Sequence, residues 1–154
     1  MIANPKWMLT VCLAAFLAPA VSRADSLEDK RRKTEMEEKM AKDATSLERV
    51  CKAKIELVMD WGSWNTLRDD HGNTPYSACQ PTWGTVESMC HAKDAQEVIA
   101  KDIRRIECKG GGTDGDKHRE PDVHLNGTTL VFHGTVISHS YNADLRKYLE
   151  KNLK

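Results

Sequence analysis

Residues 122–137, DVHLNGTTLVFHGTVI, contain the clearest local structural signal in this chain of 154 residues. The dipeptide Asn126-Gly127 separates two runs rich in β-branched and apolar residues. Asn-Gly supplies the positive φ angles of a type I′ turn, so the stretch predicts a β-hairpin with a two-residue loop. The predicted register places one group of side chains on each face of the hairpin. These groups are Val123, Leu125, Leu130, Phe132 and Val136 on one face, and His124, Thr129, Val131 and His133 on the other.

Two further strands are predicted before the hairpin. Residues 53–61 alternate between apolar and polar side chains, the pattern of a strand with one solvated face, although a helix continuing past Cys51 fits the same residues. Residues 103–108 are interpreted as a strand or as an extension of the preceding helix. With the hairpin, these segments predict a small antiparallel sheet of about four strands.

Helices are expected on one face of this sheet, which makes the predicted fold class α+β. The middle helix, around Tyr76 to Cys90, contains Pro81, which must kink the helix or start it afresh. Further helices are expected from Asp94, as the N-cap, to Lys101 and over residues 142–152. No internal repeat is evident in the sequence.

A strongly charged segment precedes the predicted domain. Residues 25–50 carry 15 charged side chains in 26 positions, many with opposite signs four residues apart, which favours a helix. Only the second half has an apolar stripe, formed by Met36, Met40, Ala44 and Leu47. We interpret residues 25–50 as a charged helical spacer and residues 51–154 as a disulfide-stabilised α+β domain.

The first 24 residues are typical of a secretory signal peptide. Lys6 precedes an uncharged apolar run that ends at Pro19, and cleavage is expected after Ala24, with Ala20 as the second choice. The apolar run is shorter than the roughly 20 residues of a spanning helix, so we expect no membrane span after signal removal. The predicted location is secreted or periplasmic.

Four cysteines remain after removal of the signal segment, namely Cys51, Cys79, Cys90 and Cys108. An even number of cysteines in an exported chain predicts two disulfides. Cys79 and Cys90 share one stripe of the middle helix about 16 Å apart, too far to be bridged. The pairing Cys51–Cys90 with Cys79–Cys108 is preferred, and Cys51–Cys79 with Cys90–Cys108 stays open.

Composition and motifs exclude several classes of function. The chain has 23 basic and 23 acidic residues, so it lacks the basic excess typical of nucleic-acid binders. It is too short for a barrel enzyme of about 250 residues, and no G-x-S-x-G motif marks a hydrolase. The glycine-rich residues 110–116 resemble a fragment of a calcium-binding loop, but a single copy is expected to be a connector.

No metal ion or cofactor is predicted. Among the six histidines no pair has the spacing of a helical HExxH site. His124 and His133 share a face of the predicted hairpin but are expected more than about 10 Å apart, too far to share one ion.

The candidate recognition region is the polar loop around Trp61 to Tyr76. Trp64, Arg68 and Tyr76 are the predicted binding residues, because aromatic side chains beside an arginine are typical of binding hot spots. The competing interpretation is that Trp64 folds back to cap the core. His124 and His133, on the solvated sheet face, form the second candidate surface.

The resulting hypothesis is a non-enzymatic secreted or periplasmic domain that binds another macromolecule, such as an inhibitor, an immunity-type protein or an envelope accessory factor. The expected partner is a protein or an envelope macromolecule. One alternative is a small secreted hydrolase or lyase. The other is a structural subunit that assembles through its charged N-terminal helix.

Overall fold

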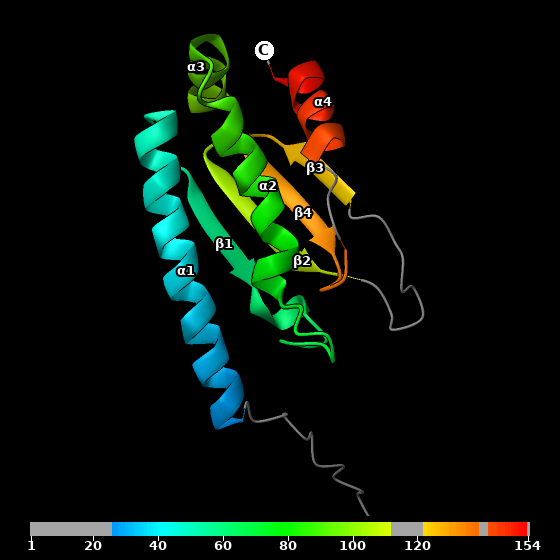
Figure 1. The fold of residues 1–154 in the computed structure, drawn as a ribbon. Helices are drawn as coiled ribbons and strands as arrows, with labels where there is room; N and C mark the ends of the chain where they lie inside the picture. The colour runs from blue at the N-terminus through cyan, green and yellow to red at the C-terminus, as the bar shows by residue number, and fades with distance from the viewer. Residues whose placement is uncertain (1–25, 112–121, 139–141, 154) are drawn as a thin grey trace, which may run out of the picture.

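Helices cover one face of a four-stranded sheet in the computed structural model (Figure 1), which describes residues 26–111, 122–138 and 142–153. The elements in chain order are α1 (Leu27–Cys51), β1 (Glu56–Asp60), the 3₁₀ helix η1 (Trp61–Ser63), α2 (Pro75–Met89), α3 (Lys93–Asp102), β2 (Arg105–Gly110), β3 (Asp122–Asn126), β4 (Thr129–Gly134) and α4 (Asn142–Asn152). The α+β class is thereby confirmed. The predicted signal segment, residues 1–24, lies outside the described residues.

The sheet is mixed, so the prediction of an antiparallel sheet is wrong. Its strand order is β1-β2-β4-β3, and only the β3–β4 pair is antiparallel. β1 pairs with β2, and β2 with β4, in parallel. The physical reason is the connection between β1 and β2, which contains α2 and α3. A crossover of a dozen or more residues that contains a helix is the connection that parallel strands need.

The hairpin is confirmed, but its turn lies one residue later than predicted. Asn126 pairs with Thr129, which leaves Gly127 and Thr128 as the two loop residues. Gly127, the first loop residue, has a φ of 60°, and Thr128, the second, is not among the residues with positive φ, so the turn matches type II′ rather than type I′. The new register differs from the predicted one by two residues, and the side chains therefore keep their predicted faces.

The core lies between the sheet and the helices. The strand residues Ile106, Cys108, Leu130 and Phe132 have no exposed area and point to the helical layer, where Leu149 of α4 is equally buried. Burial of apolar side chains contributes about 25 cal/mol per Å² of surface removed from water, so this layer is the main source of stability. The opposite face of the sheet carries no helix (Figure 1).

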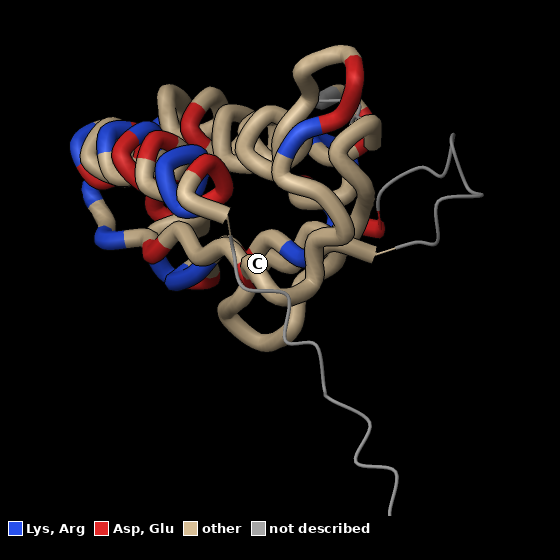
Figure 2. Tube along the Cα trace, turned by 90° about the horizontal axis from the view of Figure 1, so that it is seen from below, with Lys and Arg blue, Asp and Glu red and all other residues tan. Residues whose placement is uncertain are grey.

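The first half of α1 is charged and its second half joins the core. Ser26 caps the helix by accepting a hydrogen bond from the amide of Asp29 at 3.1 Å. The buried residues of α1 are Met36, Met40, Leu47 and Cys51, and three of them belong to the predicted apolar stripe. Basic and acidic residues are interspersed along this helix (Figure 2). The predicted boundary after residue 50 therefore falls within a helix that shares the domain core.

α2 and α3 differ from their predicted forms in two details. α2 continues through Pro81 as one helix, and a capping box between Thr74 and Ser77 starts it. The N-cap of α3 is Ala92, without a side-chain hydrogen bond, and Asp94 lies in the first turn instead of at the cap. An acidic residue there still interacts favourably with the helix dipole.

No helix among the described residues is both long enough and apolar enough to span a membrane.

Two disulfides attach α2 to its neighbours, with the preferred pairing. Cys51–Cys90 joins the end of α1 to the end of α2 with a Cα–Cα distance of 4.9 Å. Cys79–Cys108 joins α2 to β2 with a Cα–Cα distance of 6.2 Å. Each crosslink restricts the unfolded chain and is worth about 2–4 kcal/mol.

The end of β2 lies directly against the segment that follows β1. The amide of Gly110 donates a hydrogen bond to Ser63 Oγ at 2.7 Å. A Cβ atom at position 110 would lie 2.5 Å from the backbone oxygen of Ser63 and 2.8 Å from Trp64 Cα. Only glycine fits here, because the obstructing atoms belong to backbone that cannot rotate away.

We expect Gly110→Ala to lower the free energy of unfolding by about 1–3 kcal/mol, because the added methyl group must push two backbone segments apart. Gly84→Ala in the interior of α2 is the matched control. The nearest atom there is the flexible Gln80 amide at 3.5 Å, so helix propensity should stabilise that variant by about 0.5–1 kcal/mol. Urea unfolding measures both values, and equal stability of Gly110→Ala and wild type would contradict the close approach.

We also expect disulfide mapping of the oxidised protein to give only the pairs Cys51–Cys90 and Cys79–Cys108. A glutamate-specific protease combined with trypsin separates Cys79 from Cys90 by cutting after Glu87. Mass spectrometry of the digest before and after reduction identifies the linked peptides. Peptides that join Cys51 to Cys79 would contradict the structure.

Candidate functional site

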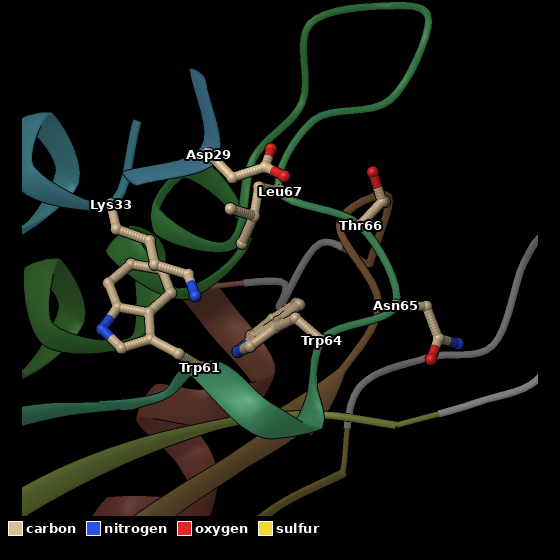
Figure 3. A pocket seen from close by; sticks show the side chains of 7 residues that line it. All are labelled: Asp29, Lys33, Trp61, Trp64, Asn65, Thr66 and Leu67. Carbon is tan, nitrogen blue, oxygen red and sulfur yellow. The ribbon is translucent and has the colours of Figure 1, made fainter. Parts of the chain in front are cut away.

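A pocket of about 290 Å³ lies where the first turns of α1 meet the segment after β1 (Figure 3). It is open on one side and lies at the end of the sheet where β1 finishes. Two tryptophans, two charged side chains from α1 and three loop residues line it. These residues are Asp29, Lys33, Trp61, Trp64, Asn65, Thr66 and Leu67.

Local hydrogen bonds fix the tryptophan-bearing segment. Ser63 Oγ donates to the carbonyl of Asp60 at 2.7 Å, which closes the η1 turn directly after β1. Trp61 Nε1 donates to Glu37 Oε1 on α1 at 3.0 Å. The half-buried indole of Trp61 is therefore attached to the helix that forms the opposite wall of the pocket.

Trp64 belongs both to the core and to the pocket. Only 8% of its surface is exposed, and it packs in the hydrophobic cluster, as the capping interpretation expects. It also lines the pocket, with its indole nitrogen on the side that faces Trp61 (Figure 3). That nitrogen is buried and has no hydrogen-bond partner among the described residues. Buried N–H groups without partners are rare in folded proteins.

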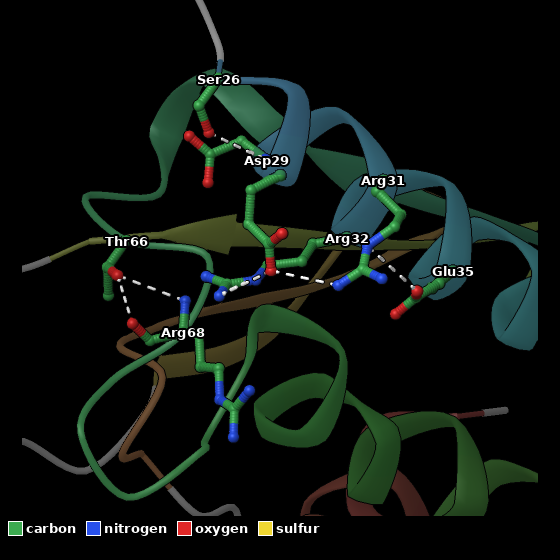
Figure 4. A network of polar contacts seen from close by, with 8 residues as sticks. Ser26, Asp29, Arg31, Arg32, Glu35, Thr66 and Arg68 are labelled. Carbon is green, nitrogen blue, oxygen red and sulfur yellow. Dashed lines mark hydrogen bonds and ion pairs between the residues drawn. The ribbon is translucent and has the colours of Figure 1, made fainter.

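Ion pairs stiffen the helical turns that carry Asp29 and Lys33 (Figure 4). Glu28 accepts contacts from Arg31 at 3.2 Å and from Arg32 at 3.1 Å, and Arg31 also approaches Glu35 at 3.7 Å. Exposed pairs at this spacing contribute about 0.3–0.5 kcal/mol each. They favour a formed helix in a part of α1 that buries no side chain.

Arg68 lies outside the pocket. Its backbone closes a tight turn with Thr66, whose Oγ1 donates to the Arg68 carbonyl at 2.7 Å and accepts from the Arg68 amide at 3.2 Å. Its exposed guanidinium points away from the acidic residues at the start of α1 (Figure 4). Trp64 and Arg68 were predicted to form one binding site, but Trp64 is buried beside the pocket and Arg68 is exposed outside it.

A second turn orders the loop after Arg68. Asp69 accepts hydrogen bonds from the Asn73 side chain at 2.7 Å, from the Asn73 amide at 2.7 Å and from the His71 amide at 2.9 Å. These bonds, above all the one from the Asn73 side chain, lower the pKa of Asp69 below its usual range. The loop therefore has its own internal framework and positions the start of α2.

Tyr76 lies between α1 and α2, away from the pocket lining. Its hydroxyl donates to Asp43 Oδ2 at 2.9 Å, and the Trp83 indole donates to the same oxygen at 2.9 Å. The two rings pack with a centroid distance of 5.7 Å, and Lys39 lies 5.5 Å from the Tyr76 centroid. Tyr76 therefore connects α2 to α1 and does not line the pocket.

His124 and His133 lie on the open face of the sheet. His124 Nδ1 contacts Asp122 Oδ2 at 3.0 Å. His124 pairs with Val131, so His133 is its diagonal neighbour at a typical Cα distance of about 7–8 Å, closer than the predicted separation. No group of three or more histidine, cysteine or acidic side chains that could hold a metal ion occurs among the described residues.

Of the predicted binding residues, only Trp64 lines the pocket. Asp29, Lys33 and Trp61 complete it, and the sequence does not show their proximity because α1 and the loop are about 30 residues apart. The one available signal is the pair Trp61 and Trp64, three residues apart beside Asn65 and Thr66.

Comparisons of the chain with protein-family models, with curated proteins and with solved structures give no match.

The Tyr76–Asp43 contact generates a pH-dependent prediction. Burial, the hydrogen bond to Asp43 and its negative charge raise the pKa of Tyr76 from 10.0 to about 12. Because this pKa is higher in the folded than in the unfolded protein, the Tyr76 hydroxyl stabilises the folded state below pH 10. This stabilisation is lost as the pH rises through about 12. Asp43→Asn removes the charge, so the pKa of Tyr76 should fall towards its ordinary value.

Phenolate absorbance after a rapid pH jump measures this titration, and Tyr76→Phe identifies the phase that belongs to Tyr76. An alkaline tyrosine titration that Asp43→Asn leaves unchanged would contradict the contact.

Proposed function

We propose that this protein is a secreted or periplasmic, non-enzymatic domain that binds another macromolecule through the pocket between α1 and the Trp61–Leu67 segment. The observation that carries the proposal is the Trp64 indole N–H, which is buried without a partner beside a pocket lined by a second tryptophan. A donor without a partner gains a hydrogen bond from any acceptor that reaches it from outside the chain.

The construction of the pocket favours recognition. Its walls come from a capped helix and from a loop closed by hydrogen bonds, so the binding groups are held in place before a partner arrives. Preorganised side chains lose little conformational entropy on binding. Tryptophan provides a large rigid contact area, which is why it is enriched in binding hot spots.

Export is supported by the crosslinks and the sequence. The two disulfides, Cys51–Cys90 and Cys79–Cys108, are consistent with an oxidising compartment. The apolar segment before residue 25 is typical of a signal peptide. A binding domain outside the cytosol would meet envelope polymers, surface proteins or secreted enzymes.

The open sheet face is a weaker candidate because its charges are already matched to one another. Glu107 contacts Lys109 at 3.3 Å and Arg105 at 3.9 Å, and Arg105 also contacts Glu56 at 3.8 Å. A partner on this face would compete with these contacts. Arg105 Nε is likewise buried without a partner on this face, but the other guanidinium nitrogens of Arg105 are already held by two carboxylates. The pocket donor, Trp64 Nε1, is the only polar atom of its side chain and has no acceptor among the described residues.

Photo-crosslinking tests the location of the binding site. We expect benzoylphenylalanine at the exposed Asn65, on the pocket rim, to attach a discrete partner from the envelope fraction or the medium of the producing cells. The same group at Lys147 is the matched control, because this residue is exposed on α4 at the other end of the molecule (Figure 1). Excess unlabelled wild-type protein should suppress the product at Asn65.

Products of equal yield at both positions, or none at Asn65, would contradict the proposal. A crosslink obtained only from His133 would move the binding site to the open sheet face.

A further inference from the structure

The charges in the pocket lining favour a neutral ligand. Asp29 contributes one negative charge and Lys33 one positive charge, and the other lining residues are uncharged. The two charged groups are four residues apart on α1, where opposite charges interact favourably. The lining therefore has no net charge, and an anion or a cation would gain contact with one of the two at the cost of repulsion by the other.

Two indoles are held in place in a lining that is otherwise mostly polar. Trp61 is fixed by its hydrogen bond to Glu37 and remains partly exposed, while Trp64 is anchored in the core. A ligand that contacts the exposed part of Trp61 needs an apolar face of its own. A pyranose ring has one, because its C–H groups gather on a face while its hydroxyls lie around the edge, and indole faces bind polarised C–H groups.

The remaining lining groups suit the edge of such a ring. The Asp29 carboxylate has two acceptor oxygens, and the Asn65 amide at the rim has a donor beside an acceptor. The Thr66 hydroxyl already donates to the Arg68 carbonyl and keeps one acceptor position. A planar amide or carboxylate can contact two adjacent hydroxyls at once. Sugar hydroxyls both donate and accept, so they match a mixed set of this kind without requiring a charged ligand.

The Trp64 N–H adds a specific donor. Trp61 donates to Glu37 and Trp83 donates to Asp43, whereas Trp64 has no acceptor among the described residues. A buried donor without a partner costs about 1–3 kcal/mol, which a ligand oxygen would recover. Because the nitrogen has almost no exposed area, the oxygen reaches it only after the residues that cover it move aside.

The size of the pocket limits the ligand to one ring. Its volume of about 290 Å³ is at the lower end of the usual range for small-ligand sites, about 300–1,000 Å³. The open side lets the next residue of a longer chain continue into solvent. We infer that the pocket binds one neutral pyranose residue of a glycan, stacked on Trp61 and accepting a hydrogen bond from Trp64 Nε1. This inference rests on the proposed function and names the class of its partner.

Indole N–H signals in ¹H–¹⁵N spectra of the oxidised full-length protein test this assignment. The described residues contain three such groups, those of Trp61, Trp64 and Trp83, and single Trp→Phe variants assign them. The probes are a β-1,4-linked N-acetylglucosamine trimer, a cellulose trimer, a maltose-series trimer and choline. At least one trisaccharide should shift the Trp64 signal downfield and move that of Trp61, while that of Trp83 stays in place.

Variants then locate the binding groups. Trp64→Phe removes the donor and should weaken the responding trisaccharide about tenfold, consistent with one hydrogen bond. Asn65→Ala should weaken it several-fold while leaving the core intact, because Asn65 is exposed. His124→Ala on the open sheet face is the matched control and should leave the affinity unchanged. Thermal unfolding of each variant separates lost binding from lost folding.

Two outcomes would overturn the inference. One is the absence of any Trp61 or Trp64 shift with all three trisaccharides at concentrations of about 10 mM, well above a dissociation constant of 1 mM. The other is a response to choline alone, which would make the pocket a cation site of the aromatic type. A protein partner crosslinked at Asn65 without any saccharide response would overturn the glycan assignment and leave the proposed function standing. Failure of both experiments would overturn both.

Discussion

The position of α2 is the constraint on which the rest of this structure depends. One disulfide ties its end to the end of α1, and the other ties its first turns to β2 in the centre of the sheet. The helix layer and the sheet layer are thereby joined covalently at two points. A sheet covered on one face only has a thin core, and small domains of this kind rely on crosslinks because they bury a smaller fraction of their surface than larger ones.

The disulfides hold only one end of α1, and packing must hold the other. Asp29 is 22 residues before Cys51, a distance of roughly 33 Å along a helix that rises about 1.5 Å per residue. Between them, Met36 and Met40 are buried, Asp43 accepts hydrogen bonds from two aromatic side chains of α2, and Glu37 accepts one from Trp61. The acidic residues of α1 thus act as acceptors for aromatic donors, which places the start of the helix beside the loop after β1.

That placement gives the pocket its chemical character. The charged turns of α1 would be an ordinary solvated helix surface by themselves, and the Trp61–Leu67 segment would be a short aromatic loop. Together they enclose a space with a balanced pair of charges, two indoles and a buried donor without a partner. The close contact of Gly110 with Ser63 and Trp64 fixes the loop from the sheet side. The proposed recognition of a neutral sugar residue follows from this combination and from no single motif.

The sequence by itself determined the local elements, because these depend on periodicity, turn residues and helix ends. The Asn126-Gly127 hairpin and the last helix were predictable in this way. The strands at residues 56–60 and 105–110 were expected, but the same residues also fitted helices, and the structure decided for strands. Geometry along the middle helix excluded the bridge between Cys79 and Cys90, and the preferred pairing is the one found.

Tertiary structure alone decided that three strands run parallel, because strand order depends on how the α2–α3 crossover packs against the sheet. It alone separated Arg68 and Tyr76 from Trp64 and brought in Asp29 and Lys33, because contacts between distant segments leave no periodic signal in the sequence.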